Sequence, residues 1–233
     1  FISTVSHELR TPLTSITGAL GLLKSGELGP MPEETAHMVT IAHGNSERLV
    51  RLINDILDMD KIESGKMDFK MGRVELSGLL ERSLEETRAY GEQYGVSFDF
   101  QKITVGAWVR GDADRLLQVL VNLISNGAKF SPEGGRVEVA LSENESGYRV
   151  EIADHGPGVP EEFQDKIFEK FTQADATDHR QKGGTGLGLS ICKAIIEQHG
   201  GQIGFGPTPG GGATFHFTLG GYEDTEVETI DRR

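Results

Sequence analysis

The chain has 233 residues, which is enough for one large domain or for two smaller ones that each have a core. Its formal net charge of −13 argues against a nucleic-acid partner, because binding DNA or RNA requires a basic face. No apolar run approaches the roughly 20 residues that span a bilayer, and the single cysteine, Cys192, cannot form an intrachain disulfide.

These features predict a cytoplasmic segment that makes no membrane contact of its own. The first residue is Phe1 and not Met, so we expect an excised fragment, which is compatible with a membrane-anchored parent protein.

Residues 1–66 are predicted to form a helical hairpin. Apolar side chains recur at three- and four-residue steps in two stripes, separated by a turn signature at 26–30, and Gly65 is the expected end of the second helix. The stripes are Ile2, Val5, Leu9, Leu13, Ile16, Leu20, Leu23, and then Met38, Ile41, Leu49, Leu52, Ile53, Ile56 and Leu57. Two helices cannot bury stripes this wide, so we expect a second copy to complete a homodimeric four-helix bundle.

Residues 67–221 show a different pattern, in which short strand-like runs alternate with helical stretches. The strand-like runs are 67–76, 96–101, 107–111, 135–142, 147–154, 202–206 and 213–219, and the helical stretches are 77–94, 113–130 and 186–199. This alternation predicts an α/β sandwich, so the whole chain is of the α+β class. Residues 222–233 are acidic and poor in apolar side chains, and are expected to form a tail or linker.

His7 lies early on the first predicted helix, off the apolar stripe, in Ser6-His7-Glu8-Leu9-Arg10-Thr11-Pro12. A neutral imidazole can attack a phosphoryl group, and the adjacent Glu8 is suited to accept the ring proton. Thr11 shares a helical face with His7. The alternative is an exposed histidine without a function, which is the usual case for an arbitrary histidine.

A helix at 113–130 is predicted to present amides to a ligand. Gln118, Asn122 and Asn126 are spaced by four residues and line one face, while leucines and Ile124 line the other. Asparagine oxygens are suitable Mg²⁺ ligands where phosphates supply the remaining oxygens, and Lys129 is placed to meet an anion. The alternative is a merely solvated face, which more often carries Glu and Lys.

Glycine is overrepresented, because an average content of about 7% would give roughly 16 glycines and the chain has 31.

Asp154, ahead of Gly156 and Gly158, can present a carboxylate to a heterocycle with an exocyclic amine, although a generic tight turn would look the same. The run from Gly183 to Ile191 suits phosphate binding by backbone N–H groups. It is not a Walker A loop, because no Lys-Ser/Thr follows.

The segment between these glycine clusters is predicted to be a hinged flap over the ligand. Phe168 and Phe171 would fix it, and the polar stretch at 174–182 would close over the terminal phosphate.

In this order the motifs resemble the histidine kinases of two-component signalling, over about residues 1–220. The matching stretches are Ser6 to Pro12 for the H box, Asn122 to Phe130 for the N box, Asp154 to Gly158 for the first glycine box, Phe168 to Phe171 for the F box, and Gly184 to Gly188 for the second glycine box. The resemblance implies a dimerisation and phosphotransfer domain at 1–66 and an ATP-binding domain at 67–221, of the Bergerat type shared with Hsp90, gyrase and MutL-like ATPases.

The resemblance also implies roles for individual residues. His7 would receive the γ-phosphoryl group of ATP and pass it to an aspartate on a response regulator receiver domain, with Glu8 as general base and Thr11 serving dephosphorylation of the regulator. Asn126 would coordinate Mg²⁺ and Asp154 would bind the adenine amino group. The implied nucleotide site comprises Asn122, Asn126, Lys129, Phe130, Asp154, Gly156, Gly158, Phe168, Phe171, Gly184, Thr185, Gly186, Leu187, Gly188 and Leu189.

Two other functions share part of these motifs. An ATPase that drives a conformational clamp would use 112–188 but has no use for the His7 motif on a dimerising hairpin. A non-catalytic signalling scaffold would not need intact nucleotide boxes. For the kinase, the 64–72 connection is the expected hinge between the hairpin and the nucleotide domain.

Overall fold

The computed structural model describes residues 2–101, 106–172 and 184–222, except for the side chains of residues 2–7. Its helices are α1 (Ile2–Ser25), α2 (Glu33–Glu63), α3 (Leu76–Tyr94), α4 (Ala113–Phe130), α5 (Glu161–Gln164) and α6 (Gly188–Gln198). Its strands are β1 (Gly72–Glu75), β2 (Ser97–Gln101), β3 (Trp108–Gly111), β4 (Arg136–Asn144), β5 (Gly147–Ala153), β6 (Gln202–Pro207) and β7 (Ala213–Gly220). Apart from Tyr222, the predicted tail lies outside the described residues.

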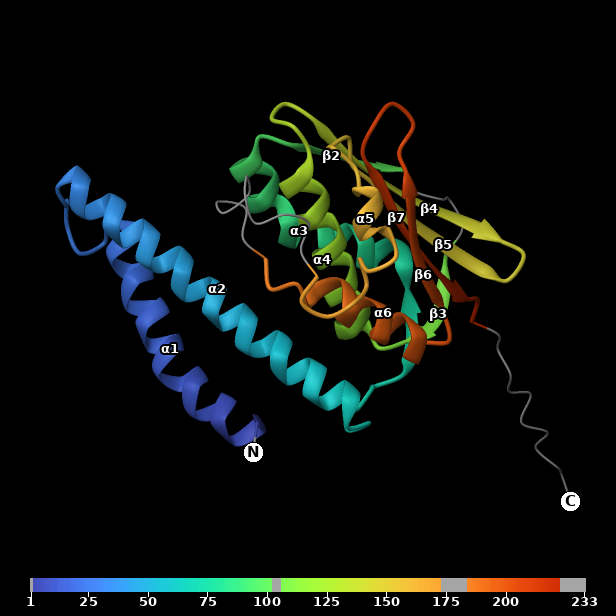
Figure 1. The fold of residues 1–233 in the computed structure, drawn as a ribbon, viewed down its shortest axis with the longest axis horizontal. Coiled ribbons are helices and arrows are strands. Elements are labelled where there is room, and N and C mark those ends of the chain that lie inside the picture. Colours follow the sequence, from blue (N-terminus) through green and yellow to red (C-terminus); the bar gives the residue numbers. More distant parts are fainter. Residues whose placement is uncertain (1, 102–105, 173–183, 223–233) are drawn as a thin grey trace, which may run out of the picture.

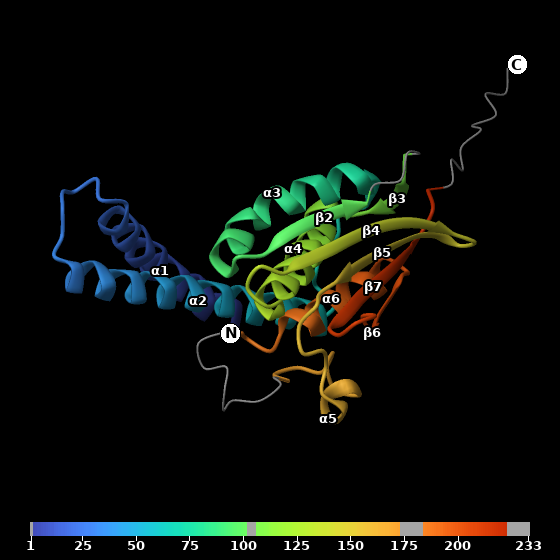
Figure 2. The same ribbon diagram turned by 90° about the horizontal axis from the view of Figure 1, so that it is seen from above.

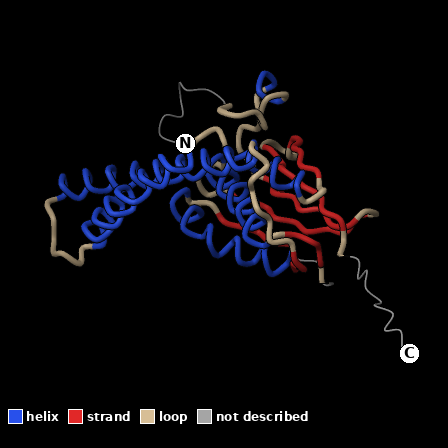
Figure 3. The backbone as a smooth tube through the Cα atoms, turned by 90° about the horizontal axis from the view of Figure 1, so that it is seen from below, coloured by secondary structure: helices blue, strands red, loops and turns tan. Residues whose placement is uncertain are grey.

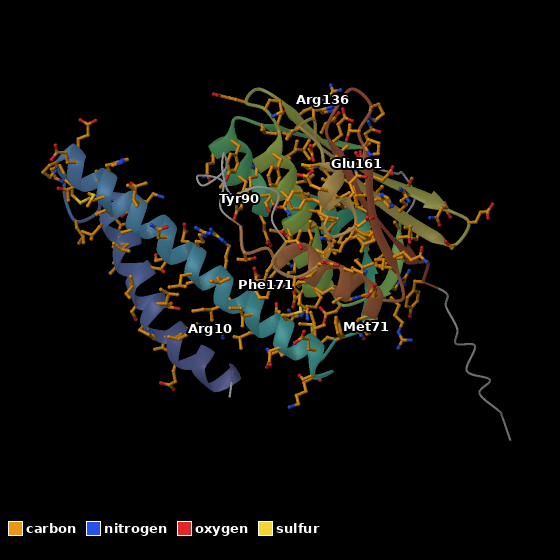
Figure 4. All side chains as sticks on the ribbon, viewed as in Figure 1. Arg10, Met71, Tyr90, Arg136, Glu161 and Phe171 are labelled. Carbon is orange, nitrogen blue, oxygen red and sulfur yellow. The ribbon has the colours of Figure 1, made fainter. Side chains whose placement is uncertain are left out.

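The first two helices form the predicted antiparallel hairpin, which projects from one end of the molecule (Figures 1 and 3). A small core of Leu13, Ile53 and Leu57 joins the two helices. Arg10 points from α1 toward α2 (Figure 4), where its Nη2 donates to Asn54 Oδ1 at 2.7 Å. Much apolar surface of the hairpin stays uncovered in the single chain. The large exposed apolar side chains of the described part of the hairpin are Leu9, Ile16, Leu22, Leu28, Met38, Ile41, Leu49 and Ile56.

The remaining elements, from β1 to β7, make up a unit that we call the α/β unit. A five-stranded sheet has the order β2-β4-β5-β7-β6, in which β2 and β4 are parallel and the other neighbours are antiparallel. A second, two-stranded sheet pairs β1 with β3. α3, α4 and α6 cover one face of the larger sheet (Figure 2), and the predicted α/β sandwich is confirmed.

The period-2 alternation of the strands explains why only one face is covered. On β4 the side chains of Val137, Val139 and Leu141 are buried, whereas the residues between them are more exposed. α4 supplies much of the opposing surface, because Leu116, Leu120 and other apolar side chains on one of its faces are fully buried. Among the described elements, none is packed over the polar face of the sheet.

The hairpin is docked on the α/β unit through the C-terminal half of α2 (Figure 1). α2 packs against α6, and its buried Met59 belongs to the same apolar cluster as the core of the α/β unit. α2 therefore lies between α1 and the α/β unit.

One predicted strand is too long, and one short helix is missed. The strand predicted at 67–76 pairs only from Gly72 to Glu75. Before that, the backbone N–H of Lys70 donates to the Asp112 carboxylate, and Phe69 packs edge-on against the ring of His199. Residues 69 and 70 are thus held by the Asp112 carboxylate and the His199 ring, and not by pairing with a neighbouring strand. The four-residue α5 is too short to show a helical period.

Asp112 joins that stretch to the start of α4. Its buried carboxylate caps α4 by accepting the backbone N–H groups of Asp114 and Arg115 at 3.0 and 3.1 Å, and it accepts Lys70 N–H at 2.7 Å. Burial by itself raises the pKa of this carboxyl, but the three backbone hydrogen bonds and the positive charge of Arg115 outweigh burial and lower the pKa.

We predict that Asp112→Ala lowers the free energy of unfolding at pH 7 by about 1–2 kcal/mol, because an N-cap and the partner of Lys70 N–H are both lost. A group whose pKa is lowered in the folded state stabilises above its unfolded pKa of about 3.9, and this contribution is lost as the pH falls through the folded pKa. The free energies of unfolding of wild type and of the isosteric, uncharged Asp112→Asn, measured with urea, should therefore begin to converge as the pH falls below about 4 and should meet below the folded pKa. A stability gap that stays constant or widens in acid would contradict this assignment.

Candidate functional site

Three glycines bring the predicted motifs together around the C-terminal half of α4. A Cβ atom at Gly156 would lie 2.4 Å from the carbonyl oxygen of Phe130, and one at Gly188 would lie 2.5 Å from Nδ2 of Asn122. A Cβ at Gly184 would lie 3.5 Å from Nζ of Lys129. The loop after β5 and the loop before α6 therefore both converge on α4, and the first two approaches are closer than any side chain allows.

Asp154 is a buried acceptor at the end of β5, with 5% of its surface exposed. Its Oδ1 accepts the backbone N–H groups of Gly156 at 2.9 Å and Ala213 at 3.2 Å. Within the described ranges Oδ2 has no donor, so it is the oxygen that can accept a hydrogen bond from an exocyclic amine. Burial raises the pKa of this carboxyl, although its two hydrogen bonds oppose the rise.

The predicted amide stripe on α4 divides into two parts. Asn126 Nδ2 donates to Asn122 Oδ1 at 3.2 Å, and Asn122 Nδ2 donates to the Cys192 sulfur of α6 at 3.1 Å. Gln118 turns away from them and donates to Asp58 of α2 at 2.8 Å. The expectation that all three amides face a ligand is therefore wrong for Gln118, because a carboxylate on the hairpin is its partner. At the end of the helix, Lys129 Nζ lies 4.8 Å from the ring centroid of Phe130.

The second glycine box forms a tight turn before α6. Gly186 has a φ of 72°, and its carbonyl accepts the backbone N–H of Phe171 at 2.8 Å. Thr185 Oγ1 accepts the N–H of Leu187 at 3.2 Å and donates to Asp55 of α2 at 2.7 Å. Leu187 is buried, Leu189 is half-buried, and Gly158 on the facing loop also has a positive φ of 77°.

The two phenylalanines of the F box have different environments. Phe168 is half-buried and lies 6.3 Å from the ring of Phe205 and 6.5 Å from that of Phe215. Phe171 is 68% exposed on the side of the α/β unit toward α2 (Figure 4), and its φ of 61° is unusual for a non-glycine residue. The expectation that both rings fix the flap is wrong for Phe171, and the polar stretch at 174–182 lies outside the described residues.

The H box lies on α1, on the other side of α2 from the α/β unit (Figure 1). Glu8 and Thr11 are exposed, and the His7 side chain lies outside the described part of the structure. Pro12 stands inside the helix, as expected.

The contact between α2 and the nucleotide motifs was not predicted from the sequence. Asp58 accepts both Arg115 Nη1 at 3.1 Å and Gln118 Nε2 at 2.8 Å, while Asp55 accepts Thr185. Burial raises the pKa of Asp55, and the negative charge of Asp58 adds to the rise. The available signal was a pair of acids three residues apart within the apolar stripe, which places both on a buried edge of the helix.

A separate hollow of about 400 Å³ lies on the open face of the sheet, where its lining includes Glu138, Arg149, Glu151 and His216. It contains none of the residues that the nucleotide motifs supply. We therefore assign the candidate site to the α4 side and not to this hollow.

Two families match the chain. The family described as "His Kinase A (phospho-acceptor) domain" matches residues 1–65, and the family described as "Histidine kinase-, DNA gyrase B-, and HSP90-like ATPase" matches residues 111–222. The circadian input-output histidine kinase CikA of Synechococcus elongatus is 38% identical over 100% of this chain and 31% of its own length. Sensor histidine kinase WalK of Bacillus subtilis is 34% identical over 97% of this chain and 37% of its own length.

Solved structures of histidine kinases are also similar to this chain. Full-length ShkA in complex with AMPPNP has a TM-score of 0.74 and 31% identity, covering 93% of this chain and 44% of ShkA. The mycobacterial sensor histidine kinase MprB has a TM-score of 0.56 and 30% identity, covering 65% of this chain and 97% of that chain. The chain belongs to the histidine kinases, with a HisKA region followed by an ATPase region of the gyrase and Hsp90 type. It spans about a third of the length of the curated relatives above, and no helix in the described ranges is long and apolar enough to cross a membrane.

We predict that Asp58→Ala loosens the docking of α2 on the α/β unit, because Arg115 and Gln118 lose their shared acceptor. Hydrogen bonds to charged groups contribute about 1.5–3 kcal/mol, so the undocked population should rise roughly tenfold or more. Hydrogen exchange followed by mass spectrometry should show faster exchange at 52–62 and unchanged exchange in α3.

The matched control is Glu86→Ala, which removes the acceptor of an exposed pair with Arg82 on α3. It should leave exchange at 52–62 unchanged. Equal protection of α2 in wild type and Asp58→Ala would show that the carboxylate does not hold the two parts together.

Proposed function

We propose that this chain is an ATP-dependent histidine autokinase that phosphorylates itself on His7 and passes the phosphoryl group to an aspartate on a response regulator receiver domain. The observation that carries the proposal is the convergence of both glycine boxes on the N box at α4. The N box and the two glycine boxes are distant in sequence and meet there, and a nucleotide site of this kind needs all three. We further propose 1–66 as the phosphotransfer domain and 67–221 as the ATP-binding domain.

The donor groups present suit Mg²⁺ and ATP. Asp154 Oδ2 would accept the adenine amino group, and the glycine-rich turn before α6 would place backbone N–H groups near phosphate oxygens. Asn126 would hold the cation through Oδ1, because its Nδ2 is already bonded to Asn122. Lys129, which lies beside Gly184, would meet the phosphates. When bound, Mg²⁺ neutralises charge on the phosphates during transfer.

The chemistry on the hairpin requires a neutral His7. Its ring nitrogen attacks the γ-phosphorus in line, a nitrogen–phosphorus bond forms, and the bond from that phosphorus to the β–γ bridging oxygen breaks to release ADP. Glu8, exposed beside it, takes the proton from the other ring nitrogen. Thr11, one turn further and also exposed, would serve dephosphorylation of the regulator.

The same function requires the α/β unit to move relative to the hairpin. α2 separates α1 from the nucleotide motifs in this arrangement, so transfer within one chain needs undocking, and transfer to a partner needs a second copy. The exposed apolar stripes of α1 and α2 support a homodimer through the hairpin. Since Phe69 and Lys70 are held by the α/β unit, the hinge expected at 64–72 narrows to the residues before them.

The main prediction concerns the acceptor. Incubation with Mg²⁺ and γ-³²P-ATP should label the wild-type chain with acid-labile, alkali-stable phosphate, and His7→Gln should remove the label while ATP binding stays within about twofold. His37→Gln, which changes an exposed histidine on α2, is the control that should keep the label. Label that survives in His7→Gln would reject this acceptor, and stable turnover of ATP without label would favour the clamp ATPase.

A second prediction tests the role of Asp154 in base recognition. ATP offers an amine where GTP offers a carbonyl, so wild type should prefer ATP, and Asp154→Asn should lose about tenfold in ATP affinity while affinity for GTP falls less. Calorimetric titration with both nucleotides measures this, with Asp165→Asn at an exposed acid after α5 as control. Equal losses for ATP and GTP would mean that Asp154 holds the loop and does not read the base.

A further inference from the structure

One face of α6 is fitted to the amide of Asn122. Gly188 and Cys192 lie one turn apart on this helix and both contact Asn122 of α4. A Cβ at Gly188 would lie 2.5 Å from Asn122 Nδ2 and 2.8 Å from its Oδ1, so glycine is needed for the amide to fit. The half-buried Asn122 side chain is thus packed closely against α6.

The hydrogen bonds through this amide run in one direction in the structure. Cys192 donates its S–H to the carbonyl oxygen of Val119 at 4.0 Å, so its sulfur lone pairs accept Asn122 Nδ2 at 3.1 Å. Asn122 Oδ1 then faces Asn126 and accepts Nδ2 of that residue at 3.2 Å. The Asn126 amide is left with Oδ1 on its other branch, where no residue in the described ranges bonds to it.

Reversing one amide reverses the next. If Asn122 turned over, its NH₂ group would face the NH₂ group of Asn126, and Asn126 would have to turn as well. The Asn126 NH₂ would then occupy the position of its oxygen, and an N–H donor cannot coordinate a cation. The orientation of Asn126 is therefore coupled through Asn122 to the sulfur of Cys192.

We propose that Cys192 is a positioning residue for the cation site: together with Gly188 it fixes the amide of Asn122 and thereby turns Asn126 Oδ1 toward Mg²⁺. The inference rests on the proposed function, in which Asn126 holds the ion. It assigns Cys192 no contact with nucleotide or metal. Supporting groups of this kind orient metal ligands, and their removal typically weakens metal binding about 10–100-fold.

The environment of Cys192 suits this role and not a reactive one. The side chain is 1% exposed, and burial raises the pKa of the thiol to about 12, so it stays a neutral S–H group with a defined donor and acceptor. A valine at this position would have a similar volume but would leave the half-buried Asn122 NH₂ without its acceptor. A serine would keep both the donor and the acceptor.

The test is the Mg²⁺ dependence of ATP binding, measured by calorimetric titration of the whole chain with excess Mg²⁺ and with EDTA. The readout is the ratio of the dissociation constant in EDTA to that in Mg²⁺. Cys192→Val should lower this ratio about tenfold through weaker binding in Mg²⁺, while binding in EDTA stays within about twofold. Cys192→Ser should keep the wild-type ratio.

The matched control is Ile195→Val, which removes a methylene from the buried face of the same helix. It should lower the thermal midpoint but leave the ratio unchanged. If Cys192→Val lowers affinity equally in EDTA and in Mg²⁺, or leaves the ratio at the wild-type value, Cys192 is only a packing residue and the inference fails. If wild type does not bind ATP at all, the proposed function itself fails. If wild type binds ATP equally well in EDTA and in Mg²⁺, so that the ratio of the two dissociation constants is one, Asn126 is rejected as the cation ligand.

Discussion

The two-sided nature of α4 is the constraint on which the rest of the structure depends. One side of the helix is fully buried and holds α3, α6 and the sheet together, so the helix cannot shift without disrupting the core. The other side carries Asn122, Asn126 and Lys129, and these side chains are held in place because they stand on the same immobile helix. Both glycine boxes must therefore approach α4, and glycines are required where their backbones meet it.

α2 is shared between two functions in the same way. Along its length it pairs with α1 and contributes to the exposed apolar surface that a second copy would cover. Toward its C-terminus, Asp55, Asp58 and Met59 turn to the α/β unit instead. A change in how the hairpin packs would thus reach Thr185, in the second glycine box, through a single hydrogen bond.

The sequence predicted most of the fold, because periodicity and glycine spacing are local properties. It also named the glycines and asparagines that the structure brings together at α4. The amide ladder at Asn122 and Asn126 follows directly from a spacing of four residues. Gln118 has the same spacing, yet Asp58, 60 residues earlier, takes it as a partner. The exposure of the Phe171 ring and the contact between the Cys192 sulfur and Asn122 likewise depend on segments that are distant in sequence. The local sequence pattern does not encode such contacts.

The chemistry of the α2 contact fits the movement that the proposed phosphotransfer would require. Asp55 and Asp58 accept hydrogen bonds from the α/β unit, and water can replace these donors on undocking, so each bond contributes only about 1.5–3 kcal/mol to the docked state. Met59 is instead buried in the core of the α/β unit, close to the end of α2, and separating it from that core exposes apolar surface. The polar part of the contact should therefore open first, and separation of Met59 from the core is the costlier step of undocking.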